Sequence, residues 1–154
     1  MNPWECKKWR KIYASKKFRH GIVILSEDTV PQNIRDEFSQ FNKWLINHFD
    51  FPIQIKTTLI NSKMVQMNNG AWTYGIFKYY SSNRYPVIKM PVASGEINWD
   101  IEDILGSYVH ELTHYFQWLN QYEQTDQESE RQANYHRYRK IRNYYKDIGR
   151  DTIV

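Results

Sequence analysis

The chain has 154 residues, of which 41% are hydrophobic and 16% aromatic. This length fits one domain, residues 1–154, and the apolar content excludes a disordered protein. The single cysteine, Cys6, excludes an internal disulfide framework. The only early apolar run, residues 21–25, is too short for a signal peptide or a membrane span. We therefore expect no membrane partner and a soluble protein of the reducing cytoplasm.

The net charge of +4 conceals a segregation of charges along the chain. The basic N-terminal segment, residues 1–20, carries seven Lys or Arg against Glu5, and residues 131–146 carry six without an acid. Residues 96–130 hold nine Asp or Glu and no Lys or Arg. An acidic stretch attracts a divalent cation, whereas basic ends either favour anionic partners such as nucleic acid or an acidic protein, or are solvated surface.

The first third of the chain predicts two helices and a strand. Helical spacing of Trp9, Ile12 and Tyr13 among lysines indicates a short amphipathic helix over residues 4–17. Residues 21–25 indicate a buried strand. Pro31 then opens a stronger helix that should pack on a sheet, because apolar residues recur along one of its faces: Ile34, Phe38, Phe41, Trp44, Leu45 and Phe49.

The middle of the chain predicts three more strands. Residues 51–60 alternate with the period of a half-buried strand. The segments 72–80 and 85–92 form a hairpin in this interpretation, because residues 81–84 have a turn composition. Two prolines, Pro86 and Pro91, place the last strand near an edge or an end of the sheet.

From Asp100 onward the pattern changes to two helices, one to about Asn120 and one over about residues 127–148. The chain is therefore predicted to be α+β, with a small, mostly antiparallel sheet packed on these two helices.

Residues 110–114 form an HExxH pattern in the first of these two helices. Side chains four residues apart lie on one helical face, so the imidazoles of His110 and His114 can bind the same zinc ion. Glu111 is then placed to act on a water at that ion without binding the ion itself, which is the position of a general base.

The rest of this helix supports the interpretation. An apolar stripe lies almost opposite the two histidines and consists of Ile101, Leu105, Tyr108, Leu112, Phe116 and Leu119. The histidine side carries smaller or polar residues instead: Asp103, Gly106, Ser107, Gln117 and Gln121. The helix should therefore bury its back and present its histidines to a polar cleft.

A catalytic zinc ion usually has three protein ligands and one open position, so a further donor is needed. Helical phase places Glu130 on the inward face of the last helix, with Asn134 and Ile141. The same phase places Glu128 on the outward face, near a helix start where its charge is favoured by the dipole. We expect Glu130 to be the third ligand, and Glu128 is the alternative.

These motifs resemble the gluzincin metallopeptidases, in which a later helix supplies a glutamate to an HExxH zinc site. Residues 130–134, Glu-Arg-Gln-Ala-Asn, look like the corresponding segment of ImmA-like peptidases. The resemblance implies a small zincin-like domain with peptidase activity. It also implies that Asn134 orients a histidine ligand, in the place where many gluzincins have an Asp.

The same resemblance implies a mechanism and a substrate, a peptide or a protein. Part of residues 71–80 would hold the substrate backbone by strand addition, as in minimal zincin domains. Glu111 would take a proton from the attacking water and pass it to the leaving amine. The developing oxyanion needs a donor, and the candidates follow Glu130 closely: Tyr135, His136, Arg137 and Tyr138.

A second hypothesis is a binding module with a structural or latent zinc site. In that case the basic N-terminal segment docks on nucleic acid or an acidic protein, with Trp4, Trp9 and Tyr13 stacking on bases between the lysines and arginines. An ordinary amphipathic helix with solvated lysines accounts for the same pattern.

Overall fold

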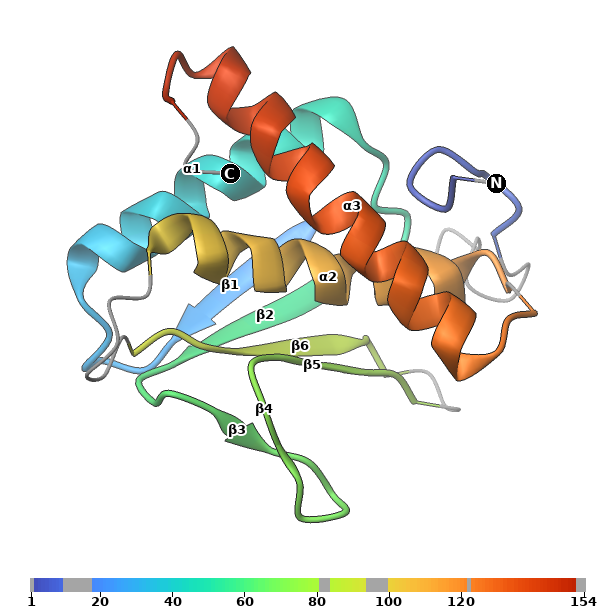
Figure 1. Cartoon of the computed structure of the whole chain (residues 1–154), viewed down its shortest axis with the longest axis horizontal. Helices are drawn as coiled ribbons and strands as arrows, with labels where there is room; N and C mark the ends of the chain where they lie inside the picture. Colours follow the sequence, from blue (N-terminus) through green and yellow to red (C-terminus); the bar gives the residue numbers. More distant parts are fainter. Residues whose placement is uncertain (1, 10–17, 81–83, 94–99, 122, 152–154) are drawn as a thin grey trace.

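The computed structural model describes residues 2–9, 18–80, 84–93, 100–121 and 123–151. These residues form an α+β fold in which three helices lie on one side of a four-stranded sheet (Figure 1). A short two-stranded arm projects from the other side. The elements in chain order are β1 (Ile22–Ser26), α1 (Gln32–His48), β2 (Ile55–Ile60), β3 (Val65–Gln66), β4 (Trp72–Thr73), β5 (Ile76–Lys78), β6 (Val87–Pro91), α2 (Ile101–Leu119) and α3 (Asp126–Asp147). The predicted α+β class is confirmed.

The sheet is mixed, so the prediction of a mostly antiparallel sheet was wrong. Its strand order is β1-β2-β6-β5, and both the β1–β2 and the β2–β6 pairs are parallel. Only β5 and β6 pair in the antiparallel sense. The connections explain the parallel pairs. The helix α1 lies between β1 and β2 in the chain, so it brings the chain back to the end of the sheet where β1 began. The β3–β4 arm and β5 do the same between β2 and β6. Alternation of apolar and polar residues predicts which face of a strand is buried, but it does not predict whether the strand runs parallel or antiparallel to its neighbours.

The predicted hairpin of residues 72–80 and 85–92 is present in shorter form. Tyr74 and Gly75 divide its first strand into β4 and β5, and β4 pairs with β3, a strand that was not predicted. The strand β6 lies inside the sheet, so Pro86 and Pro91 mark its two ends and not an edge. Of the predicted turn, residues 81–83 lie outside the described part.

The predicted N-terminal helix over residues 4–17 is not formed in its described part. Residues 3–5 form a turn, residues 6–9 are irregular, and residues 10–17 lie outside the described part. Trp4 is only 3% exposed, and its indole Nε1–H donates to Thr113 Oγ1 at 3.0 Å on the back of α2. Across the described ranges, no helix has the length and apolar character needed to cross a bilayer.

Two buried tyrosines fix α2 on the layers beneath it. The Tyr108 hydroxyl donates to Asn42 Oδ1 of α1 at 2.9 Å and lies 2.9 Å from Thr57 Oγ1 of β2. The Tyr115 hydroxyl donates to the Ile53 carbonyl at 2.6 Å. The predicted apolar stripe is buried with them, at 0–1% exposure for Leu105, Tyr108, Leu112, Phe116 and Leu119. Fixing the back of α2 in this way turns its histidine side outward.

A tight connection folds α3 back against the outer side of α2 (Figure 1). Gln121 adopts a φ of 55° just after the helix end, a left-handed conformation that terminates helices. Thr125 then caps α3, because its hydroxyl accepts from the Glu128 backbone N–H at 3.1 Å. The two helices run antiparallel, so side chains late in α2 meet side chains early in α3.

Candidate metal centre and cleft

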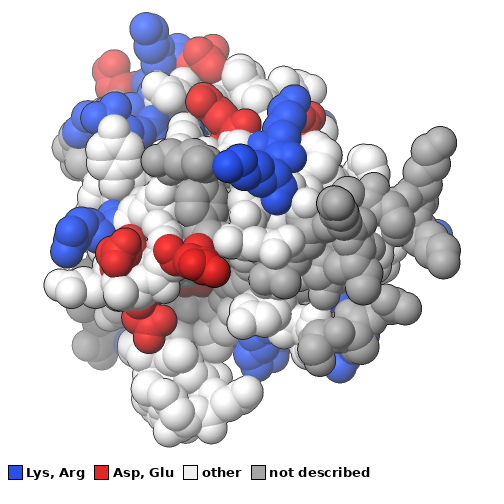
Figure 2. Space-filling view, turned by 90° about the vertical axis from the view of Figure 1, so that its right-hand side faces the viewer, with Lys and Arg blue, Asp and Glu red and all other residues white. Residues whose placement is uncertain are grey.

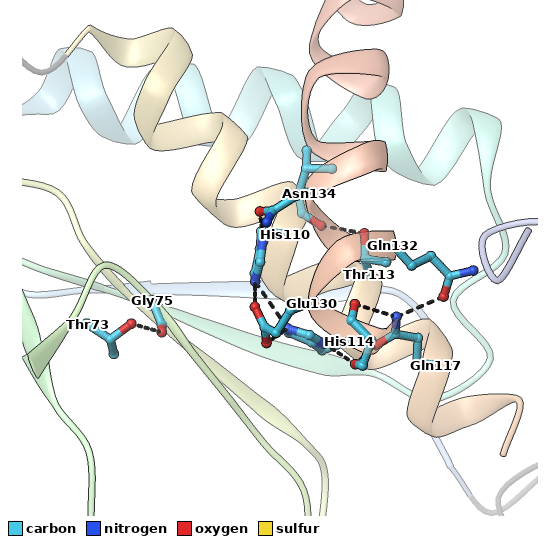
Figure 3. Close-up of polar contacts among 11 residues, drawn as sticks. Thr73, Gly75, His110, Thr113, His114, Gln117, Glu130, Gln132 and Asn134 are labelled. Atoms are coloured by element: carbon cyan, nitrogen blue, oxygen red, sulfur yellow. Dashed lines mark hydrogen bonds and ion pairs between the residues drawn. The ribbon is translucent and has the colours of Figure 1, made fainter. Parts of the chain in front are cut away.

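Three side chains of the predicted set converge at the crossing of α2 and α3. Glu130 Oε2 lies 2.9 Å from His110 Nε2, and Glu130 Oε1 lies 2.9 Å from His114 Nε2 (Figure 3). The two Nε2 atoms are 3.2 Å apart, and all the candidate ligand atoms lie within 4.8 Å of one another. These three side chains can hold a metal ion.

The alternative ligand, Glu128, does not join this cluster. Its carboxylate accepts from the Thr125 hydroxyl at 3.1 Å while its backbone N–H donates to that hydroxyl. This reciprocal contact at the start of a helix occupies Glu128 with capping, and it directs the side chain away from α2. Glu130 lies half a turn further along α3, on the face that meets the histidines.

Each histidine is held from behind by an amide oxygen. His110 Nδ1 lies 3.0 Å from Asn134 Oδ1, and His114 Nδ1 lies 2.8 Å from Gln117 Oε1. Because a carbonyl oxygen can only accept, both Nδ1 atoms carry a hydrogen, and in the neutral imidazole each Nε2 atom then keeps a lone pair. This tautomer is the one that a metal ligand needs, and it leaves the lone pairs pointing at Glu130.

The orientation of Gln117 is fixed by its own partners. Its amide nitrogen donates to the Ser129 carbonyl at 3.1 Å and to Gln132 Oε1 at 2.8 Å, so its oxygen must face His114 (Figure 3). The Ser129 hydroxyl donates to that same oxygen at 2.7 Å. The sequence placed Gln117 on the histidine side but gave it no role. The feature of the sequence that could have predicted this role is a polar residue three positions after the second histidine, on the same helical face.

The local electrostatics suit a neutral imidazole. Burial lowers the pKa of His110 below its ordinary value, and the nearby charge of His114 lowers it further, against an opposing effect of Glu130. The exposed fraction of the side chains is 15% for His110 and 17% for His114, but 57% for Glu130. Two imidazoles and one carboxylate match a zinc donor set, and the exposed carboxylate leaves the cluster open to solvent.

Glu111 lies beside this cluster, between α2 and the edge strand β5. Its burial raises the pKa of the carboxyl to about 7, and the charge of Glu130 raises it as well. The charge of His114 and a hydrogen bond from the Phe77 backbone oppose this shift. A carboxyl with a pKa near neutrality can both take and release a proton at physiological pH.

Gly75 leaves the space that Glu111 occupies. A Cβ atom added at Gly75 would lie 3.0 Å from Glu111 Cγ and 3.2 Å from Met90 Sδ. The backbone between β4 and β5 therefore approaches Glu111 more closely than a larger residue permits. Sequence reasoning missed this role, although a glycine inside a predicted strand often marks a close backbone approach.

Two cavities, one beside His114 and one beside His110, together form the candidate cleft. The half that we call the Tyr79 half has a volume of about 630 Å³ and is bordered by three aromatic rings and three carboxylates beside His114: Phe77, Tyr79, Trp118, Glu123, Asp126 and Glu130. The Gly75 half has a volume of about 310 Å³ and contains His110, Glu111 and Asn134, with Thr73, Tyr74, Gly75, Ser107 and Arg137 around them. Figure 2 shows acidic side chains gathered on the end of the molecule where α2 stops and α3 begins.

Of the four candidate oxyanion donors, only Arg137 lines this cleft. His136 is 4% exposed and packs inside the protein. Tyr135 and Tyr138 are 55% and 44% exposed and lie against the guanidinium groups of Arg139 and Arg137. Three of the four are therefore packing or surface residues.

Two residues in the described part of the basic N-terminal segment, Trp4 and Lys7, make contacts within the protein. Trp4 is buried in the core, so its ring cannot stack on a base as the second hypothesis requires. Lys7 pairs with Asp50 at 3.0 Å. Tyr13 and most of the remaining basic residues of the segment lie at positions 10–17, outside the described part.

Comparison with protein-family models, with curated proteins and with solved structures finds no match to this chain.

Proposed function

We propose that this chain is a zinc-dependent peptidase of the gluzincin type. The observation that carries the proposal is the convergence of His110, His114 and Glu130 within 4.8 Å, beside a half-buried Glu111 that lines an open cavity. The HExxH spacing supplies two of these ligands from one helical turn, and the antiparallel α2–α3 pair supplies the third.

His110, His114 and Glu130 would hold the ion, with Asn134 and Gln117 orienting the imidazoles. Zinc held by these three side chains would supply an acidified water and would polarise a scissile carbonyl. Because both Nε2 lone pairs already face Glu130, little rearrangement is needed when the ion binds.

Glu111 would act as the general base and then as the general acid. Its carboxylate takes a proton as the water attacks the scissile carbonyl, and it delivers that proton to the leaving amine. Burial raises the pKa of this carboxyl, which makes its carboxylate a better proton acceptor. Gly75 and the Phe77 backbone hold the carboxyl in place.

The substrate would lie along the edge strand β5. This strand pairs with β6 on one side only, and residues 75–79 border both halves of the cleft. An extended peptide that adds to this edge passes directly over the histidine cluster. The site and the edge together favour peptide bonds over other hydrolysable bonds.

The decisive experiment compares Glu111→Gln with the wild type. Purified protein is loaded with zinc, its metal content is measured by elemental analysis, and a peptide library is digested with and without a chelator. Wild type should cleave and lose activity with the chelator, whereas Glu111→Gln should keep its zinc and cleave at least about 100-fold more slowly. Glu128→Gln, which changes a capping carboxylate outside the cluster, is the matched control.

Full-rate cleavage by Glu111→Gln would refute the general-base role. Absence of cleavage by the zinc-loaded wild type would refute the peptidase proposal itself.

A further inference from the structure

We propose that Arg137 selects substrates with a carboxylate on the residue that follows the scissile bond. This carboxylate is either an Asp or Glu side chain or the free C-terminus of the substrate. The inference rests on the peptidase function proposed above and concerns the Gly75 half of the cleft.

Arg137 belongs to the same face of α3 as the metal cluster. The antiparallel packing brings Glu130 to His114, Asn134 to His110, and then Arg137 to Ser107. The spacing of residues 130, 134 and 137 is that of successive turns of one helical face. Arg137 is therefore the next residue of that face beyond the site.

Among the described residues, the guanidinium of Arg137 has no counter-charge. Its Nη2 donates to Ser107 Oγ at 3.3 Å and to the Asp103 carbonyl at 3.4 Å, both neutral acceptors. Its Nε is buried without a hydrogen-bond partner. No carboxylate of the described residues forms an ion pair with it. A partly buried cation in this state gains from an incoming anion, and a guanidinium pairs well with a carboxylate.

Gly106 makes room for this arrangement. A Cβ atom added at Gly106 would lie 3.0 Å from Arg137 Nε and 3.3 Å from Arg137 Cγ. Glycine inside a helix is unfavourable compared with alanine, so its position under the arginine is a specific accommodation. The side chain of Arg137 lies across α2 at this point and reaches the cleft.

The direction of the substrate assigns Arg137 to one side of the scissile bond. A peptide that adds antiparallel to β5 has its N-terminal part beside Tyr79 and its C-terminal part beside Gly75. The Tyr79 half carries the carboxylates of Glu123, Asp126 and Glu130, whereas Arg137 is the only Lys or Arg among the described residues that line either half. An acidic group is therefore repelled before the scissile bond and attracted after it.

The distance between Ser107 and His110 along α2 indicates that Arg137 meets the first substrate residue after the scissile bond. Ser107 precedes His110 by three residues, which is about 4.5 Å along the helix axis. An extended peptide advances about 3.3 Å per residue. The guanidinium held at Ser107 thus lies between one and two substrate residues away from the metal cluster. At this distance it can reach a carboxylate on the residue after the scissile bond, but not the carbonyl that is attacked.

The test uses the zinc-loaded full chain and a peptide library whose product ends are read by mass spectrometry. Peptides designed from the cleaved sequence then carry Glu, Gln or Lys after the scissile bond with an amidated C-terminus, and a fourth ends at that residue with a free carboxylate. Wild type should prefer Glu over Gln by about tenfold or more in kcat/KM. The fourth peptide, compared with its amide, tells whether the chain terminus serves as well as the side chain.

Three variants assign the preference to Arg137. Arg137→Gln should reduce the ratio of Glu to Gln cleavage to about 1, and Arg137→Glu should shift the preference to Lys. Arg142→Gln removes the same charge from an exposed position of α3 and should keep the wild-type ratio. An unchanged ratio in Arg137→Gln, or equal cleavage of Glu and Gln peptides by wild type, would overturn the proposal.

A binding measurement separates this proposal from the peptidase function. Zinc-loaded Glu111→Gln is titrated with short fluorescent peptides of one fixed sequence that differ only in carrying Glu or Gln at a single position. It should bind the Glu peptide more tightly than the Gln peptide only while Arg137 is present. If the selectivity in binding appears without any hydrolysis by wild type, the anion site stands and the peptidase proposal fails. If wild type hydrolyses peptides but shows no selectivity for the acidic ones, the peptidase proposal stands and the anion site fails.

Discussion

Asn134 and His110 link the two helices of the site, because Asn134 Oδ1 on α3 accepts the Nδ1–H of His110 on α2 at 3.0 Å. This contact orients the imidazole of His110, and it joins the contacts of Gln117 and Arg137 that hold α3 against α2. Many gluzincin-like sites place a carboxylate where this chain has an amide, and a carboxylate makes the imidazole a stronger base.

Removal of this contact should weaken zinc binding. We expect Asn134→Ala to raise the zinc dissociation constant by about 10–100-fold, because His110 loses its orientation. Asn134→Asp should bind zinc at least as tightly as the wild type. Asn143→Ala, an exposed position on the same helix, is the control. Competition titration with a chromogenic chelator measures all three, and equal affinity of Asn134→Ala and the control would contradict the role of Asn134.

The choice of third ligand is tested by a pair of matched substitutions. Glu130→Gln should weaken zinc binding by more than about 100-fold, since losing a ligand costs more than losing the group that orients one. Glu128→Gln should bind zinc like the wild type, because Glu128 contacts only the helix cap. The same titration decides, and a strong effect of Glu128→Gln with none of Glu130→Gln would reverse the assignment.

Substitution of Gly75 should separate metal binding from catalysis. A methyl group there meets Glu111 Cγ at 3.0 Å and Met90 Sδ at 3.2 Å, so the carboxyl must shift. Displacement by about 1 Å can reduce a rate by about 100-fold. We expect Gly75→Ala to keep stoichiometric zinc by elemental analysis while kcat falls by at least about tenfold. Wild-type kcat in this variant would show that Gly75 does not position Glu111.

The contact of Trp4 with Thr113 should appear in stability. Trp4→Ala removes a fully packed indole and should lower the free energy of unfolding by about 3–5 kcal/mol. Trp4→Phe should be milder than Trp4→Ala. Trp72 is 61% exposed, so Trp72→Ala should change stability by no more than about 0.5 kcal/mol. Urea unfolding followed by circular dichroism measures each variant, and similar values for Trp4→Ala and Trp72→Ala would be inconsistent with the buried position of Trp4.

His136 should make the protein sensitive to acid. Burial, together with the charges of Lys140 and Arg139, lowers its pKa from an ordinary 6.5 to about 4. Between these two pH values the unfolded state binds a proton that the folded state does not, so the free energy of unfolding should fall as the pH falls through this window. At lower pH both states are protonated and this contribution is constant.

The variant His136→Gln isolates that effect, because the difference between its unfolding curve and the wild-type curve removes the contributions of other groups. This difference should depend on pH between about 6.5 and about 4. The exposed His20 is the control, and His20→Gln should retain the wild-type dependence. Parallel curves for His136→Gln and wild type would show that His136 is not buried in its neutral form.

The residues of the candidate site could largely be chosen from the sequence, because their geometry is local. Two histidines four apart on a helix share a face whatever the rest of the chain does, and the apolar stripe of α2 fixes which face is buried. Helical phase likewise favoured Glu130 over Glu128. In both helices the period of 3.6 residues connects position in the sequence directly with direction in space.

The tertiary structure decided what depends on contacts between distant segments. Strand direction in the sheet, the burial of Trp4, the support of His114 by Gln117 and Ser129, and the approach of Gly75 to Glu111 have no local period. The same applies to Arg137, whose partners on α2 lie some 30 residues away. A sequence specifies which side of each element is apolar, but the rotation and height at which elements pack follow from the shapes of many side chains at once.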